Sequence, residues 1–376
     1  MAAEAIQMVD LRRQYERLRA EIDPAMHAVL EQSAFIQGPA VKAFTAELSA
    51  YLGGVPVVTC GNGTDALQIA LMALDLKAGD EVIVPAFTYI AAAEAALLLG
   101  LTPVLVDVDP RTFNLDPNQL EAALSARTKA IVVVHRFGQC ADMEPILRWA
   151  KQHQLKVIED NAQSLGATCR FADGAEVPAG LIGDIGTTSF FPSKPLACYG
   201  DGGALFIKDA VLAERARRIA THGQQVKYHH AIVGCNSRLD TLQAAVLRVK
   251  LAHLAEFTAA RQAVAARYDV AFATLPDVQI PWRAPYSTHV YHQYTVQVPA
   301  EKRTTWQAAL KERGVPSMVY YPLSLTEQVV MQGKARIVGE CPVAQRLSRS
   351  VLSLPIHTEM RVEEIETIIE SVKALR

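Results

Sequence analysis

The sequence has little of what marks proteins that bind nucleic acid or that depend on disulfides or zinc. Its 37 lysines and arginines are balanced by 39 acidic residues, so the formal net charge is only −2. A chain with this balance has no overall attraction for a polyanion. The six cysteines are scattered, without a CxxC pair or a cysteine–histidine cluster: Cys60, Cys140, Cys169, Cys198, Cys235 and Cys341. We therefore expect no nucleic-acid partner, no bound metal and no disulfide framework, and a location in the reducing cytoplasm.

Long uninterrupted apolar runs are also missing. The most apolar stretch, residues 90–109, is broken by Glu94, Gly100 and Pro103, and is too short to cross a bilayer. Residues 1–23 alternate charged and apolar side chains without the continuous apolar segment of a signal peptide. This pattern predicts an amphipathic N-terminal helix and no insertion into a membrane.

Half of the 376 residues are hydrophobic, which is enough for a large core and suggests two domains. Short β-branched runs alternate with helical segments from residue 55 to residue 207. The predicted strands are residues 55–60, 81–87, 102–109, 130–136, 156–160, 186–191 and 203–207. Apolar strands separated by helices predict an α/β domain whose mainly parallel sheet is covered on both faces.

The second half of the chain has a different pattern. Residues 238–273 have apolar side chains at helical spacing and no proline or glycine, which predicts one long connecting helix. Strand-like runs at 292–299, 317–322 and 350–355 then mix with helical segments and predict a smaller α+β domain. The expected division is an N-terminal helical segment (1–36) packing on the small domain, a large α/β domain (37–237), the helix (238–273) and the small domain (274–376).

Lys194 lies in a Pro-, Ser- and Gly-rich loop between two strand-like runs, residues 183–191 and 202–209, with no acidic residue beside it. An ordinary solvated loop lysine needs no such setting. The alternative is an amine held in a cleft by a hairpin-like turn. A partly desolvated lysine loses its proton more easily and can form a Schiff base with an aldehyde cofactor.

Three polar signals follow other predicted strands. Residues 61–65, with the sequence GNGTD, open a helix whose free N–H groups can hold an anion, although such a turn taken alone more often simply caps the helix. Asp160 ends the strand 156–160, where it could pair with a pyridinium nitrogen or simply cap a helix. Gln163, three residues on, could reach the phenolic oxygen of the same ring.

Aromatic and hydroxyl side chains add to this set. Tyr89 follows the strand 81–87 and could cover one face of a heterocycle, with Phe87 as the competing residue. Ser189 could add a hydroxyl to a phosphate site, and His135 could contact a substrate or be structural. An anion cradle, an aromatic ring, a carboxylate and a lysine at successive strand ends are the four groups that pyridoxal 5′-phosphate (PLP) requires.

Five motifs together resemble the DegT/DnrJ/EryC1/StrS family of sugar aminotransferases, over nearly the whole chain. They are GNGTDAL (61–67), PAFTYIA (85–91), EDNAQ (159–163), GDIGTTSFFPSKPLACYGDGGAL (183–205) and CNSRLDTLQAA (235–245). The resemblance implies the fold type I of aspartate aminotransferase. It is strongest to the members that aminate carbon 3 of UDP-2-acetamido-2-deoxy-3-oxo-glucuronate for bacterial O-antigen, with glutamate as donor and 2-oxoglutarate as product.

The resemblance also assigns roles by position. It implies that Lys194 is the Schiff-base lysine and general acid/base, that Asp160 and Gln163 pair with the ring nitrogen and phenolic oxygen, and that Tyr89 stacks on the ring. The phosphate would be held by four residues of the chain and by one reaching across a homodimer with shared active sites. Those residues are Gly63, Thr64, Asp65 and Ser189, and Asn236 of the partner.

The sugar-binding side departs from the family pattern. Arg136 stands in HRFGQ where an apolar residue is usual, and YYPLSLTEQ, which begins at Tyr320, lacks a frequent histidine. Arg136 and Arg238 are candidates for binding a sugar carboxylate, with structural or surface roles as the alternative. The substrate-contact candidates are His135, Arg136, Arg238 and Tyr320.

The sequence leaves two other functions open. One is a PLP enzyme that aminates carbon 4, acts on another UDP- or dTDP-keto sugar, or dehydrates; relatives that dehydrate have histidine at the position of Lys194. The other is a non-catalytic regulator on the same fold, which we expect to have lost Lys194 or Asp160. Both residues are present.

Overall fold

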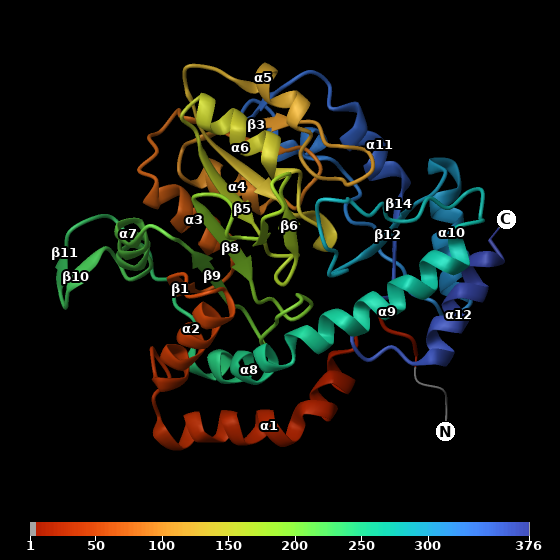
Figure 1. Cartoon of the computed structure of the whole chain (residues 1–376), viewed down its shortest axis with the longest axis horizontal. Helices are drawn as coiled ribbons and strands as arrows, with labels where there is room; N and C mark the ends of the chain where they lie inside the picture. The colour runs from red at the N-terminus through yellow and green to blue at the C-terminus, as the bar shows by residue number, and fades with distance from the viewer. Residues whose placement is uncertain (1–4, 376) are drawn as a thin grey trace.

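The computed structural model describes residues 5–375, so the first four residues of the predicted N-terminal segment lie outside it. Within that range, eight strands form one sheet in the order β1-β9-β8-β5-β4-β2-β3-β13. Strands β1, β9, β8, β5 and β3 are labelled in Figure 1. The bounds of the eight strands, in sheet order, are Val57–Cys60, Gly203–Phe206, Ile185–Ser189, Lys156–Asp160, Thr128–Val134, Glu81–Pro85, Thr102–Val106 and Arg336–Ile337. All neighbours are parallel except β9, which runs antiparallel to β1 and β8. The mainly parallel sheet is confirmed.

Helices cover both faces of the sheet, as the alternation of its buried side chains requires. On strand β2, Val82 and Val84 join one core cluster while Ile83 joins the other. The first cluster includes residues of α3 (Gly63–Ala73), α4 (Ala91–Leu98) and α7 (Ala210–Ala220). The second includes residues of α5 (Leu120–Ala123) and α6 (Met143–Gln152). Burial on both faces explains why the strands read as continuous apolar runs.

The helix expected over residues 238–273 is two helices, α8 (Thr241–Ala252) and α9 (Leu254–Phe272), which meet at His253. The amide of His253 bonds the carbonyl of Lys250 in a tight three-residue turn, and its imidazole contacts Glu21 and Glu256. The predicted single helix is therefore interrupted at His253, which is neither a proline nor a glycine and so did not mark a helix end in the sequence.

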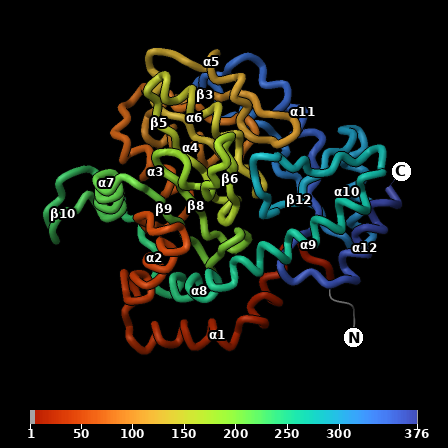
Figure 2. Tube along the Cα trace, viewed as in Figure 1, coloured from red at the N-terminus to blue at the C-terminus, as the bar shows by residue number. Residues whose placement is uncertain are grey.

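Helix α1 (Leu11–Gln32) runs beside α8, and α2 (Pro39–Tyr51) packs on the other side of α8 (Figure 2). An ion pair of 2.7 Å joins Arg13 of α1 to Glu364 of α12 (Val362–Lys373). The N-terminal segment therefore contacts both the connecting helix and the last helix of the chain.

The C-terminal part has its own small antiparallel sheet, β12 (Tyr294–Gln297) with β14 (Val351–Leu354), packed with α10 (Ala300–Glu312) and α12. The strand expected over 317–322 is not present. Only Met318 bridges to Ser353, because the chain then leaves this sheet and places Tyr320 and Tyr321 along a cavity.

One part of the C-terminal sequence packs against the large sheet instead. Strand β13 pairs with β3, and the segments η3 (Leu325–Glu327), η4 (Val329–Met331) and α11 (Pro342–Ser350) contribute buried residues to the core of that sheet. The predicted domain division stays a prediction. The predicted small domain (274–376) includes residues that pack on the large sheet.

The remaining elements are short. They are η1 (Pro117–Gln119), η2 (Arg136–Gly138), β6 (Thr168–Arg170), β7 (Glu176–Pro178), β10 (Gln224–Val226) and β11 (His229–His230). The β10–β11 hairpin projects from the body of the molecule and exposes Val226 and Tyr228 (Figure 1). No helix within residues 5–375 combines the length and apolarity needed to cross a bilayer.

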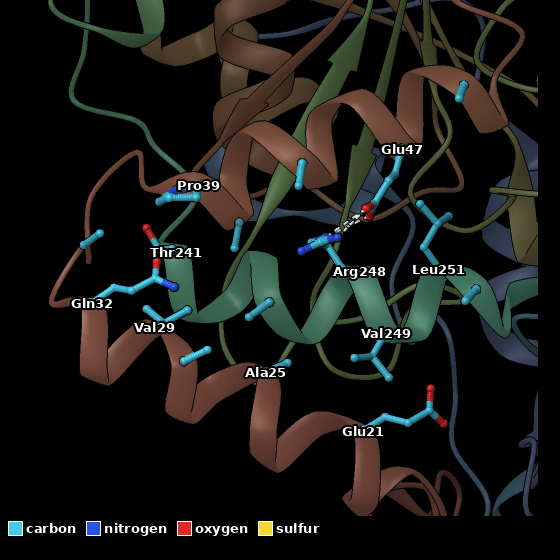
Figure 3. Close-up of a pocket in the computed structure, with 17 residues that line it drawn as sticks. Glu21, Ala25, Val29, Gln32, Pro39, Glu47, Thr241, Arg248, Val249 and Leu251 are labelled. Atoms are coloured by element: carbon cyan, nitrogen blue, oxygen red, sulfur yellow. Dashed lines mark hydrogen bonds and ion pairs between the residues drawn. The ribbon is translucent and has the colours of Figure 1, made fainter.

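A large groove of about 780 Å³ lies between α1, α2 and α8 (Figure 3). Alanines and other small or apolar side chains make up much of its lining, and its Arg248 is paired with Glu47. The residues that carry chemistry line a different cavity.

Candidate active site

A cavity of about 460 Å³ lies where β4, β5 and β8 end and α3 begins. It brings together most of the residues singled out in the sequence. Those are Gly63, Thr64, Tyr89, Arg136, Asp160, Gln163, Ser189, Lys194 and Tyr320. Ligands of parallel sheets bind at this edge, beyond the carboxyl ends of the strands.

Lys194 lies in the turn of the β8–β9 hairpin. Ser189 pairs with Gly203 at the end of the ladder, and the amide of Cys198 bonds the carbonyl of Phe190 across the turn at 2.8 Å. Protein surrounds the side chain except where it meets the cavity. This desolvation, helped by the positive charge of Arg136 and opposed by the negative charge of Asp160, lowers the pKa of Lys194 to about 8. The expected partly desolvated amine is thus present.

Asp160 is the last residue of β5, and only one of its carboxylate oxygens is bonded within the described chain. Oδ1 accepts from the amide of Ala162 at 3.1 Å. Gln163 has a fixed amide orientation, because its Oε1 accepts from the backbone N–H of Phe137 at 2.7 Å. Its Nε2 donor is therefore the group available to an oxygen in the cavity.

The anion cradle is the N-terminus of α3. Asn62 caps the helix by accepting from the amide of Asp65 at 2.8 Å, which leaves the amides of Gly63 and Thr64 at the cavity. A Cβ on Gly63 would lie 2.7 Å from the Cβ of Ser189. Only glycine allows the helix to approach the end of β8 this closely.

Tyr89 and Phe87, the two candidates for covering a ligand ring, differ in exposure. Tyr89 lines the cavity and is 58% exposed, whereas Phe87 is fully buried in the core. Tyr89 also contacts Tyr321, with ring centroids 5.9 Å apart. Tyr89 is thus the ring available to cover a ligand.

Four predicted site residues do not line the cavity. Asp65 accepts a 2.5 Å hydrogen bond from Ser237 and so joins the start of α3 to the loop before α8. His135 is buried against Glu159 at 2.8 Å and accepts from the amide of Ala141. The other two, Asn236 and Arg238, lie outside it, Asn236 exposed and Arg238 along a neighbouring groove.

Further polar residues that were not singled out from the sequence also line the cavity, among them Thr88, His292, Gln293 and Tyr321. Thr88 and Tyr321 adjoin singled-out tyrosines in the sequence, which is the one signal that could have found them. His292 and Gln293 come from the start of the small sheet and carry no such signal. Burial and the charge of Lys194 hold the pKa of His292 well below its ordinary value.

The donor set fits PLP. The α3 N-terminus suits the phosphate, Tyr89 the ring face, Asp160 the pyridine nitrogen, Gln163 Nε2 the phenolic oxygen and Lys194 the aldehyde carbon. The unbonded oxygen of Asp160 and the free donor of Gln163 are the observations that make this fit specific.

The model of the DegT/DnrJ/EryC1/StrS aminotransferase family matches residues 16–373. The chain belongs to this family. An aminotransferase from Pseudomonas aeruginosa, named for UDP-2-acetamido-2-deoxy-3-oxo-D-glucuronate, is 45% identical over 96% of this chain and 98% of its own. A pleiotropic regulatory protein of Geobacillus stearothermophilus is 44% identical (98% and 97%). A UDP-N-acetyl-3-dehydro-alpha-D-glucosamine 3-aminotransferase of Acidithiobacillus ferrooxidans is 43% identical (98% and 97%).

Two solved structures agree with the fold. DesV from S. venezuelae superposes with a TM-score of 0.94 at 39% identity, covering 99% of this aminotransferase and 98% of DesV. NtdA from Bacillus subtilis, solved with bound PMP, the pyridoxamine form of the cofactor, superposes at 0.91 with 30% identity and covers 100% and 86%. The family thus implies PLP chemistry.

Proposed function

We propose that this aminotransferase binds PLP through Lys194 and transfers the amino group of glutamate to carbon 3 of UDP-2-acetamido-2-deoxy-3-oxo-glucuronate. The product would be a 3-amino sugar nucleotide for surface polysaccharide such as O-antigen, made in the cytoplasm. The main support for this proposal is that Lys194, Asp160 and the α3 N-terminus line one cavity at the carboxyl edge of the sheet.

Bound PLP supplies an electron sink for the carbon that loses its proton. Lys194 Nζ, with a pKa of about 8, can accept a proton near neutral pH and return it as an acid. Asp160 keeps the ring nitrogen protonated, and Gln163 Nε2 donates to the phenolic oxygen. The amides of Gly63 and Thr64 hold the phosphate and so fix the ring relative to Lys194.

The choice of sugar rests on the P. aeruginosa relative, which matches almost end to end, and on the cationic Arg136 in the cavity. The A. ferrooxidans relative is named for a sugar without that carboxylate, at nearly the same identity. The substrate test is therefore a panel of UDP- and dTDP-keto sugars offered with glutamate, followed by identification of the aminated carbon. Preferential formation of the 3-amino uronate supports the proposal, and a 4-amino product contradicts it.

We further propose a homodimer whose partner subunit completes each phosphate site through Asn236. In one copy of the chain this residue is exposed and does not line the cavity, and the adjacent β10–β11 hairpin projects outward with apolar residues exposed. Sedimentation combined with an activity assay tests this arrangement. A fully active monomer contradicts it.

A regulatory protein on this fold is the competing class, which the name of the G. stearothermophilus relative keeps in view. Lys194 and Asp160 both line the cavity here, as amine transfer requires. A purified protein without cofactor absorbance after incubation with PLP would favour the regulator.

A further inference from the structure

Arg136 is a buried cation without an anionic partner in the described chain. Its side chain is only 1% exposed, yet it forms no ion pair within residues 5–375. Nη1 donates to the hydroxyl of Thr88 at 3.2 Å, while Nε and Nη2 have no hydrogen-bond partner among these residues. Buried charges are normally paired, so this arrangement calls for a ligand.

The two unbonded nitrogens share one edge of the guanidinium. Nε–H and Nη2–H point the same way and form the fork that fits both oxygens of a carboxylate. The protein provides an internal example in Figure 3, where Nε of Arg248 donates to Oε2 of Glu47 at 3.0 Å and Nη2 donates to Oε1 at 2.6 Å. Arg136 presents the same edge with no carboxylate on it.

The surroundings hold the plane of Arg136 and exclude water from it. The guanidinium carbon lies 4.8 Å from the ring centroids of both Phe137 and Tyr321, and 5.7 Å from that of Phe87. These rings offer weak cation–π attraction but no acceptor for an N–H. A bound anion would supply the hydrogen-bond acceptors that Nε and Nη2 of Arg136 lack.

A second buried arginine, Arg261, differs from Arg136 in its hydrogen-bond partners. Arg261 donates from Nη1 to the carbonyl of Ile356 at 2.8 Å and contacts two further carbonyls, which leaves only its Nε without a partner among the described residues. It does not line the 460 Å³ cavity. Backbone acceptors thus take up most of the hydrogen-bonding capacity of Arg261. Arg136 lines the same cavity as Lys194, and its charge contributes to lowering the pKa of that lysine.

We propose that Arg136 is a carboxylate receptor, which binds a carboxylate of the substrate two-pronged through Nε and Nη2 and thereby selects for acidic substrates. The inference rests on the proposed function for the reaction it serves. Both glutamate and a uronate sugar carry a carboxylate remote from the reacting carbon, and the experiment distinguishes these two sources.

The donor arm uses the purified holoenzyme and follows the conversion of the pyridoxal to the pyridoxamine form of the cofactor in single turnovers. L-Glutamate and L-alanine are compared, since alanine lacks the side-chain carboxylate. The acceptor arm starts from the pyridoxamine form and compares UDP-2-acetamido-2-deoxy-3-oxo-glucuronate with UDP-N-acetyl-3-dehydro-glucosamine, which has a hydroxymethyl group instead. Isothermal titration with glutarate gives a binding readout that requires no turnover.

Arg136→Gln is the test variant, Arg136→Lys keeps the charge without the fork, and Arg248→Gln is the matched control outside the cavity. We expect Arg136→Gln to weaken use of the carboxylate-bearing member of one pair by about 10- to 100-fold, the range for lost charge-assisted hydrogen bonds. The other member should change little. Arg136→Lys should fall between, and Arg248→Gln should match the wild type.

Loss confined to glutamate and glutarate assigns the receptor to the donor, and loss confined to the uronate assigns it to the sugar. Equal effects on all four substrates, or no effect on any, overturn the proposal. If the wild type aminates no keto sugar, the proposed substrate fails, while the donor arm and the glutarate titration still decide the role of Arg136. Melting temperatures of the variants verify that each is folded.

Discussion

His292 donates from Nε2 to the backbone carbonyl of Ser193, 3.1 Å away and one residue before Lys194. The bond joins the start of the small sheet to the loop that carries the reactive amine. Because burial and neighbouring cations keep the pKa of His292 well below its ordinary value, the ring is neutral at physiological pH and keeps one N–H to donate. His292, at the start of the small sheet, thus positions the lysine that the β8–β9 loop supplies.

We expect His292→Ala to slow turnover about 10-fold, because the Ser193 carbonyl loses its donor and the loop of Lys194 is held less firmly. His292→Gln, which keeps an N–H donor, should recover part of the loss. Steady-state rates and cofactor affinity of both variants provide the measurement. Identical rates in the wild type and His292→Ala would show that the bond does not position Lys194.

The pKa of Lys194 predicts how the apo-protein captures PLP. Only the uncharged amine attacks the aldehyde, so the capture rate should rise with pH to a midpoint near 8 and level off above it. An ordinary exposed lysine would keep rising toward a pKa of about 10.4. Stopped-flow absorbance across this range measures the midpoint.

Two variants test the cause of that midpoint. Removing the charge of Arg136 in Arg136→Met should move it upward, because that charge helps to lower the pKa of Lys194. Lys208→Ala, at an exposed site on the same segment, should leave it unchanged. A wild-type midpoint near 10 would contradict the desolvated environment of Lys194.

Gly63→Ala tests the anion cradle. The new Cβ would lie 2.7 Å from the Cβ of Ser189, so the N-terminus of α3 must shift away from the end of β8. Alanine is a better helix former than glycine, so any loss reflects this contact and not helix propensity. We expect PLP affinity, measured by equilibrium titration, to fall about 10-fold or more, a loss of about 1.4 kcal/mol. Unchanged affinity would place the phosphate elsewhere.

The mainly parallel sheet could be predicted because its strands are buried on both faces and their apolar runs are separated by helices. Lys194, Asp160 and Tyr89 could be placed in one site because parallel strands end at a common edge, and the structure puts all three there. This reasoning depends only on where a strand ends. It needs no knowledge of how distant segments pack.

The rest depends on packing that leaves no local pattern. His292 reaches the site from the small sheet, and residues 317–322 leave that sheet to line the cavity where a strand was expected. Asp65 belongs to the anion-binding motif, yet its carboxylate is bonded to Ser237. The sequence marks Arg136 as unusual, but only the coordinates show its unbonded edge.

The most direct test of the account follows the absorbance of the PLP-loaded protein after addition of L-glutamate, in the wild type and in Lys194→Ala. The wild type should convert its cofactor to the pyridoxamine form and release 2-oxoglutarate. Lys194→Ala should bind PLP and show no turnover, and Lys208→Ala should behave as the wild type. Normal conversion in Lys194→Ala would contradict the assignment of Lys194 as the catalytic amine.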